Sequence, residues 1–290
     1  MKMTRQKSFV PCAKGNTWSV PRQKKERSSC LQPAMVYLKI NNNGFKGSQW
    51  LRSDDDRHPP RKFLPFKKGD KLAGTRIIPL VIEEEKMTKA KEAAMAATGN
   101  KPILDLLPFK HKKVGIVTTG NEVFYGRIKD TFTPVIEGKM AEFDTEIIDH
   151  VTWNDDDTKV TASILDMIKK GADIVVCTGG MSVDPDDKTP LAIKNTGADI
   201  VSYGAPVLPG AMFMLAYYQV TEGENPRTVA IMGLPGCVMY AKRTIFDLVL
   251  PRVMADDQVT AEELAALGQG GLCLNCPVCS FPNCGFGKGV

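Results

Sequence analysis

Three glycine-rich turns carry the residue types of an anion-binding site. Each follows an apolar run that reads as a buried strand, over residues 114–117, 173–177 and 228–232. The turns combine glycine with hydroxyl, amide and carboxylate groups, and their residues are Thr118, Thr119, Gly120, Asn121 and Glu122, then Thr178, Gly179, Gly180 and Ser182, then Gly233, Leu234, Pro235 and Gly236. Glycine lets the backbone approach a ligand, and hydroxyl groups donate hydrogen bonds. The turns therefore predict a site for phosphate or another compact anion.

A single turn of this kind is usually an ordinary tight turn. The prediction of a binding site rests on the number of these turns and on their expected position in the sheet. Parallel strands end at the same edge of a sheet, and open α/β sheets bind their ligands at that carboxyl edge. Backbone N–H groups at the start of the following helices also attract anions. We therefore expect the three turns to form one site.

The second turn continues into an acidic stretch that ends at a helix start. Asp184, Asp186 and Asp187 lie within four positions, and Thr189-Pro190 opens the helix. Carboxylates beside a phosphate site favour Mg²⁺, which takes a few carboxylates together with phosphate oxygens. The alternative is a solvated acidic turn that caps the helix, because acids are favourable at helix N-termini. Both readings stay open at the level of sequence.

Four of the eight cysteines form a cluster near the end of the chain, namely Cys273, Cys276, Cys279 and Cys284. In a chain without a secretory signal this spacing indicates metal or redox chemistry, so we expect the reducing cytoplasm and not structural disulfides. The first three spacings resemble those that hold a [4Fe–4S] cluster, and four thiolates around Zn²⁺ are equally allowed. We expect so short a tail to fold only with its metal.

Strands and helices alternate over residues 109–255. Further strands are expected at 146–148 and 199–201, and helices at 134–142, 155–170, from 189, and at 238–250. Such alternation predicts an α/β fold with three layers, α/β/α, around a mostly parallel sheet. This sheet would place the three turns at one edge.

The flanking regions have less regular patterns. We expect residues 1–62 to be irregular, either disordered or partly translated out of frame, because a one-base shift of permitted codons for residues 49–63 yields an apolar segment. Residues 63–108 read as a β segment, a helix over 83–97 and a linker from 99, and residues 256–290 as the cysteine-rich tail. The basic run in residues 1–27 lacks interleaved aromatic residues, so nucleic acid is not the expected partner. No stretch of eighteen apolar residues predicts a membrane span.

Residues 113–255 resemble the molybdopterin-binding domain of the molybdenum-cofactor biosynthesis family. That family includes molybdopterin molybdotransferase, molybdopterin adenylyltransferase and gephyrin. The resemblance rests on four pieces in the same order, Thr119 to Val123, Thr178 to Pro190, Leu208-Pro209-Gly210, and Gly233 to Gly236. It implies molybdopterin or its nucleotide as ligand, Pro209 and Gly210 as further binding residues, and Asp187, with Asp186, as the catalytic acid that acts with Mg²⁺.

The chain departs from the family pattern at several polar positions. Asn121 stands where the family has an acid, Phe132 where it has Asn, Leu208 where it has Lys, and Cys237 where it has Asn. The departures remove a lysine that would pair with phosphate, one carboxylate and amide groups. We therefore expect binding of molybdopterin to survive better than metal insertion or adenylyl transfer.

Together these features predict a protein that binds molybdopterin or molybdenum cofactor and acts in its maturation or its delivery to molybdoenzymes. One alternative is an active molybdotransferase that uses Mg²⁺ and adenylylated molybdopterin. Another is a redox or scaffold adaptor that docks a client molybdoenzyme through the cysteine tail. The sequence leaves open the pterin form, the client and whether the chain forms oligomers.

Overall fold

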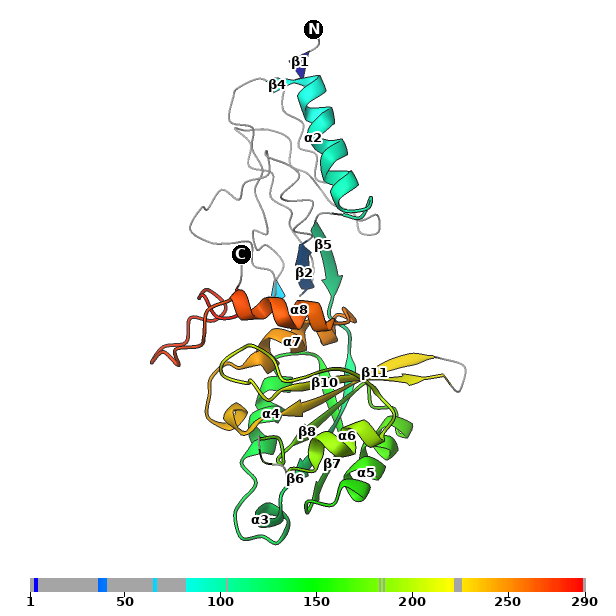
Figure 1. The fold of residues 1–290 in the computed structure, drawn as a ribbon, viewed down its shortest axis with the longest axis vertical. Helices are drawn as coiled ribbons and strands as arrows, with labels where there is room; N and C mark the ends of the chain where they lie inside the picture. Colours follow the sequence, from blue (N-terminus) through cyan, green and yellow to red (C-terminus); the bar gives the residue numbers. More distant parts are fainter. Residues whose placement is uncertain are drawn as a thin grey trace. The chain divides into compact units, whose positions relative to one another are not determined.

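The computed structural model describes residues 3–4, 36–40, 65–66, 82–102, 104–182, 184, 186–221 and 226–288. The chain divides into two compact units, Met1–Pro108 and Phe109–Val290 (Figure 1). Most of the expected irregular segment 1–62 and of the expected β segment from 63 lies outside the described residues. None of the described helices is long and apolar enough to cross a membrane.

The first unit contains short antiparallel strands and one helix. Its elements are β1 (Met3–Thr4) paired with β4 (Ile82–Glu83), β2 (Val36–Ile40) between β3 (Pro65–Phe66) and β5 (Leu104–Pro108), and α2 (Glu84–Ala97). The helix agrees with the prediction for residues 83–97. The strands β2 and β5 correct the expectation of an irregular segment and a linker, because the two pair with each other from positions far apart in the chain.

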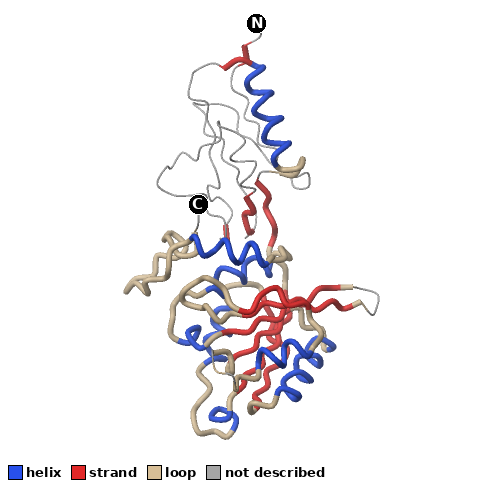
Figure 2. The backbone as a smooth tube through the Cα atoms, viewed as in Figure 1, coloured by secondary structure: helices blue, strands red, loops and turns tan. Residues whose placement is uncertain are grey.

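The second unit is built on a six-stranded sheet in the order β7-β6-β8-β11-β10-β9. Figure 2 draws its strands in red. Its strands are β6 (Lys112–Thr119), β7 (Thr145–Trp153), β8 (Ile174–Thr178), β9 (Asp199–Tyr203), β10 (Met214–Val220) and β11 (Arg227–Leu234). The strands β7, β6, β8 and β11 run parallel, and β10 runs antiparallel to both its neighbours. The prediction of a mostly parallel sheet is confirmed.

Helices lie on both faces of this sheet. They are α3 (Asn121–Phe124), α4 (Phe132–Met140), α5 (Asp157–Lys169), α6 (Thr189–Asn195), α7 (Ile245–Met254) and α8 (Ala261–Ala266), with 3-10 turns η1 (Gly236–Met239) and η2 (Leu267–Gln269). Side chains of α5 and α6 pack on one face, where Val117 and Cys177 point. Helices α4 and α7 lie on the other (Figure 1). The three-layer α/β/α prediction is confirmed.

Helix α5 shows how local sequence sets these elements. Asp156 caps it by accepting hydrogen bonds from the backbone N–H groups of Thr158 and Lys159, and Gly171, with a φ of 100°, follows its end. Val160 and Ile164 are buried on its sheet-facing side. The pattern at residues 155–170 was therefore sufficient to predict this helix.

Two expectations in this unit need correction. The single helix expected over residues 238–250 is divided into η1 and α7, because Thr244 and Asp247 form a capping box that begins α7 at Ile245. The sequence reading also missed β10. Its first four residues are buried and apolar without alternation, so this strand lacks the period-2 pattern of a half-exposed strand.

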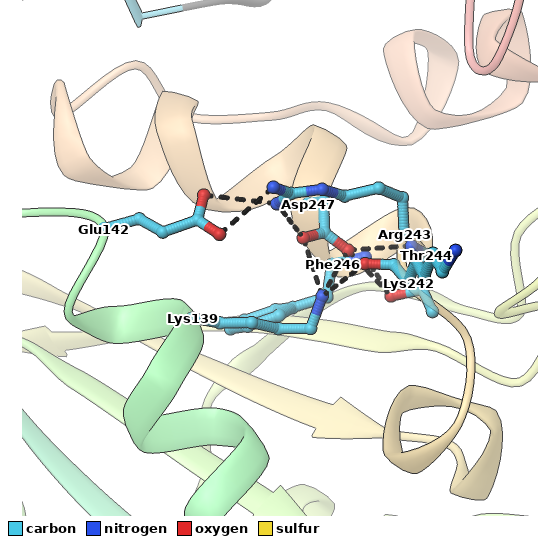
Figure 3. Close-up of polar contacts among 7 residues, drawn as sticks. All are labelled: Lys139, Glu142, Lys242, Arg243, Thr244, Phe246 and Asp247. Atoms are coloured by element: carbon cyan, nitrogen blue, oxygen red, sulfur yellow. Dashed lines mark hydrogen bonds and ion pairs between the residues drawn. The ribbon is translucent and has the colours of Figure 1, made fainter. Parts of the chain in front are cut away.

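A buried ion pair joins α4 to the start of α7 (Figure 3). The Lys139 Nζ atom lies 2.7 and 2.8 Å from the two carboxylate oxygens of Asp247, and their side chains are 9% and 3% exposed. Asp247 also accepts hydrogen bonds from Arg243 at 2.8 Å and from the Thr244 N–H at 2.7 Å. Every oxygen of this carboxylate is thus engaged, which a buried charge requires.

Replacing Asp247 by Asn should leave the Lys139 ammonium buried without its counter-charge. We expect the free energy of unfolding to fall by about 3–5 kcal/mol, the usual cost of breaking a buried pair. Asp166→Asn is the matched control, because its partner Lys170 is 52% exposed and such a pair contributes about 1 kcal/mol or less. Urea unfolding followed by circular dichroism measures both, and equal losses would show that the pair is not effectively buried.

The cysteine tail is held by contacts of its own. Gly271 bridges to Phe286, whose side chain is 2% exposed. The Lys242 ammonium donates to the carbonyl oxygens of Cys276 and Pro277 at 2.6 and 2.8 Å. These contacts fix the ends and the middle of the tail, and the expectation that it folds only with a metal stays a prediction.

Limited proteolysis of residues 270–288 tests these anchors. Phe286→Ala removes a buried side chain, which typically costs about 3–5 kcal/mol, so cleavage within the tail should become much faster. Val278→Ala, at a side chain 84% exposed, should leave the cleavage rate unchanged. A chelator with a reducing agent decides whether a metal is also needed: cleavage that stays unchanged shows that these contacts suffice, and faster cleavage shows that the tail requires a metal.

Candidate functional site

Sheet pairing brings the first two predicted turns together. Thr118 of β6 lies opposite Thr178 of β8 in a parallel pair. Just past this residue pair, the Thr119 Oγ1 atom lies 3.0 Å from the Thr189 Oγ1 atom, and Thr189 donates to the Gly179 carbonyl oxygen at 2.8 Å. The threonines are buried. They join the ends of β6 and β8 and the start of α6 into one rigid edge.

The glycines of the second turn are required by this packing. Gly179 and Gly180 have φ angles of 79° and 51°. A Cβ on Gly179 would overlap the backbone carbonyl group of Thr119, and one on Gly180 would lie 3.0 Å from the Thr189 hydroxyl oxygen. Packing alone thus explains glycine at both positions, and a ligand contact at Gly179 and Gly180 stays a prediction.

Two further glycines also serve packing. Gly210, with φ of 121°, lies against Ile245, whose N–H donates to the Pro209 carbonyl oxygen at 3.2 Å, so this segment supports the start of α7. Gly233 lies inside β11, where a Cβ would meet the Met181 side chain. The third turn thus begins after Leu234, at Pro235, and not at Gly233.

Gly120 and Gly236 differ from these four positions. No heavy atom lies within 4 Å of a Cβ built on either residue. Gly120 follows β6 with φ of 134°, and Gly236 begins η1 after β11. Of the glycines predicted to admit a ligand, these two have open space beside the backbone.

The Thr118 hydroxyl belongs to a polar network that sequence reasoning missed. Its oxygen lies 3.2 Å from both the Thr133 hydroxyl and the His150 Nε2 atom. Thr133 donates to Asp130, which also accepts the N–H groups of Phe132 and Thr133 at 2.8 and 3.1 Å. Burial would raise the pKa of Asp130, but the hydrogen bonds from Thr133 and Phe132 and the nearby His150 outweigh it and lower the pKa. Asp130 is therefore an ionised cap of α4.

Two buried polar atoms at this edge have no partner. They are the Thr178 Oγ1 and the Asn154 Oδ1, and across the described residues no other buried side-chain nitrogen or oxygen lacks one. Thr178 ends β8, and Asn154 directly follows β7. A buried unpaired polar group costs about 1–3 kcal/mol. Both unpaired atoms lie at the carboxyl ends of parallel strands, where a ligand or water would satisfy them.

The acidic turn is organised by hydrogen bonds within itself. The Asp187 carboxylate accepts the Ser182 N–H, the Ser182 hydroxyl accepts the Asp184 N–H at 3.1 Å, and the Asp184 carboxylate accepts the Asp186 N–H at 3.0 Å. The Tyr203 hydroxyl donates to the Ser182 carbonyl at 3.3 Å, and burial, followed by the Asp187 charge, raises the pKa of Tyr203. In the part of the turn that the structure describes, these carboxylates do not converge as ligands of one ion.

Asn121 and Glu122 of the first turn lie in α3, which follows the end of β6. Asn121 begins α3, and its amide donates to the Asp155 carboxylate at 2.6 Å. The Glu122 side chain is exposed, and its carbonyl accepts the Arg127 N–H at 2.8 Å. Asp155 was not predicted, although its position two residues after a strand of the same sheet could have indicated it.

The tail cysteines are free thiols. Cys276 and Cys279 are exposed, and Cys273 and Cys284 are partly exposed. Among the residues whose placement is described, no three His, Cys, Asp or Glu side chains are grouped to hold a metal ion. The four-thiolate site predicted from the spacing finds no support in this arrangement.

Comparison with known proteins identifies the domain. Residues 115–255 match the family described as "Probable molybdopterin binding domain". A CinA-like protein of Mycobacterium tuberculosis is 32% identical over 77 residues, which cover 27% of this chain and 18% of that protein. One of Syntrophus aciditrophicus is 39% identical over 81 residues, with 28% and 19% covered. The chain thus spans under a fifth of these relatives.

A solved structure, the tungsten cofactor synthesizing protein MoaB from Pyrococcus furiosus, aligns with 22% identity and a TM-score of 0.38 over 50% of this chain and 89% of that one. A score this low adds nothing to the assignment, which rests on the matched residues. The matched range starts inside β6 and ends just after α7, so it includes all three turns. Over residues 115–255 the chain contains a molybdopterin-binding domain of the molybdenum-cofactor biosynthesis family.

Proposed function

We propose that this domain binds molybdopterin or its nucleotide at the carboxyl edge of the sheet, and that the protein acts in maturation of the cofactor or its delivery to molybdoenzymes. The observation that carries the proposal is the unpaired, fully buried hydroxyl of Thr178 at the end of β8. A hydroxyl can donate to a phosphate oxygen, and its position on a central strand places it where ligands of such sheets bind.

The residues around Thr178 suit an anionic ligand, because the carboxyl edge of the sheet is already ordered before the ligand binds. Thr119 and Thr189 hold the strand ends together, so little ordering is needed on binding. Gly236 offers open space beside the backbone for the phosphate to approach. Thr118 is already paired with Thr133 and His150, so it supports the edge and leaves Thr178 to contact the ligand.

The proposal includes no metal ion. Asp187 and Asp184 are engaged by backbone N–H groups of their own turn. The tail thiols are likewise ungrouped among the described residues. Metal insertion through Asp186 and Asp187 with Mg²⁺, and a zinc or iron–sulfur adaptor role for the tail, therefore have no observation in their favour.

Thr178→Val separates a ligand contact from a structural role. Valine has the same shape and lacks the unpaired hydroxyl, so the free energy of unfolding without ligand should rise by about 1 kcal/mol. Molybdopterin binding should weaken roughly tenfold, the loss of one hydrogen bond to a charged group. The readouts are the thermal midpoint and the pterin retained on purification, measured as its fluorescent oxidation product.

Thr118→Val is the matched control, because Thr118 lies opposite Thr178 in the β6–β8 pair. Its hydroxyl has two partners, so the same change should lower the free energy of unfolding by about 1–2 kcal/mol. Stabilisation by Thr178→Val with full retention of the pterin would remove Thr178 from the site. Absence of any pterin from the unaltered protein, produced in a host that makes molybdopterin, would contradict the proposed function.

Gly236→Val tests the third turn. Open space around this residue allows the larger side chain, so circular dichroism and the thermal midpoint should change little. The branched Cβ would fill the approach of the phosphate, so pterin retention should fall at least tenfold, about 1.4 kcal/mol. The equivalent change at Gly179 should unfold the edge itself, because it would overlap the Thr119 backbone. Unchanged retention in a folded Gly236→Val protein would place the ligand elsewhere.

A further inference from the structure

An aromatic cluster borders the candidate site on the β7 side. The rings of Phe124 and Trp153 are stacked, with centroids 6.1 Å apart and planes inclined by 26°, and Tyr125 meets Phe124 edge-on at 5.2 Å. Phe124 and Tyr125 are 39% and 61% exposed. Exposed aromatic rings that lie together beside a binding edge indicate an interaction site, because contact of apolar surface with water is unfavourable.

The cluster is fixed to the same strand ends as the site. Trp153 lies opposite Thr119 in the β6–β7 pair, and its carbonyl oxygen accepts the Gly120 N–H at 3.0 Å. Its indole N–H donates to the Ser163 hydroxyl at 2.7 Å, so the ring cannot turn freely. The aromatic surface therefore begins within one residue of a glycine that has open space beside it.

Cationic groups accompany the rings. The Lys159 ammonium lies 5.5 Å from the centroid of the Trp153 ring, and the Arg127 guanidinium lies 5.9 Å from that of Tyr125. Cations at this distance are attracted to the faces of aromatic rings. The Lys159 ammonium also lies 3.4 Å from the Asp156 carboxylate, so a nearby acid offsets its charge.

Asn154 provides a hydrogen-bond acceptor that could orient a bound ring. Its Oδ1 atom is buried and unpaired, and the residue lies between Trp153 and Asp155. Asp155 is occupied by the Asn121 amide. An unpaired amide oxygen one residue after Trp153 matches a planar ring that bears N–H groups, because such a ring can stack while an N–H donates to that oxygen.

We propose that Phe124, Trp153 and Asn154 form a subsite for a flat, N–H-bearing heterocycle, and that they bind the pterin ring of the ligand. This inference rests on the proposed function, since the same ligand would place its phosphate at the Thr178 side of the edge. The rings provide the stacking surface and Asn154 selects the hydrogen-bonding edge of the heterocycle. The family match assigns no role to these side chains.

The test uses two probes with the full-length protein. Neopterin carries the ring without phosphate, and its binding is followed by its own fluorescence. Inorganic pyrophosphate carries the phosphate without the ring and is followed by calorimetry. Phe124→Leu keeps an apolar side chain but removes the ring, and Asn154→Ala removes the acceptor. Phe143→Leu is the matched control, because Phe143 forms an edge-on pair with Phe109 elsewhere in the domain.

We expect Phe124→Leu to weaken neopterin binding on the order of tenfold, as for loss of base stacking, and Asn154→Ala by roughly fivefold or more. Pyrophosphate binding should be unchanged in both, and Phe143→Leu should change neither. Neopterin affinity that survives both substitutions would overturn the subsite and leave the proposed function standing. Failure of the unaltered protein to bind either probe would overturn both.

Discussion

The parallel pairing of β6 with β8 and of β8 with β11 is the constraint on which the site depends. Thr118 lies opposite Thr178, and Thr178 lies opposite Leu234, so three strands end level with one another. Residues more than a hundred positions apart are thereby brought to one edge. Once the strands are in register, the second turn has little freedom, because the Thr119 backbone already occupies the space beside Gly179. The groups available to bind a ligand at this edge are therefore the polar groups that the packing leaves without hydrogen-bond partners.

Much of this fold could be predicted from the sequence. Helix α5 has its cap, its apolar spacing and its terminal glycine within one short segment, and β8 is an uninterrupted apolar run. The strand β10 was not recognised, because its apolar run begins with Met214, Leu215 and Ala216, residue types that favour a helix, whereas β8 is rich in β-branched residues. The division of the last helix depended on the capping box at Thr244, whose importance comes from a carboxylate buried by contact with α4.

The candidate site could be located but not described from sequence. The three turns do meet at one edge, as predicted. Glycine alone does not tell whether a backbone faces a ligand or another backbone, and of the predicted site glycines only Gly120 and Gly236 have open space beside them. Likewise Thr118 and Thr178 are the same residue type in similar turns, yet one hydroxyl is bonded and the other is not. Such differences arise from partners distant in sequence, which no local pattern contains.

The close approach of Thr119 to Gly179 has a consequence for sequence divergence. The atom that fills the space beside Gly179 is a main-chain oxygen, which every residue type at position 119 would present. No substitution in that neighbour can make room for a side chain, so glycine is imposed by the architecture whether or not a ligand is ever bound. A homologue that has lost its activity would still retain this glycine. This glycine is therefore a mark of the fold, and the residues that lack partners are the better markers of a working site.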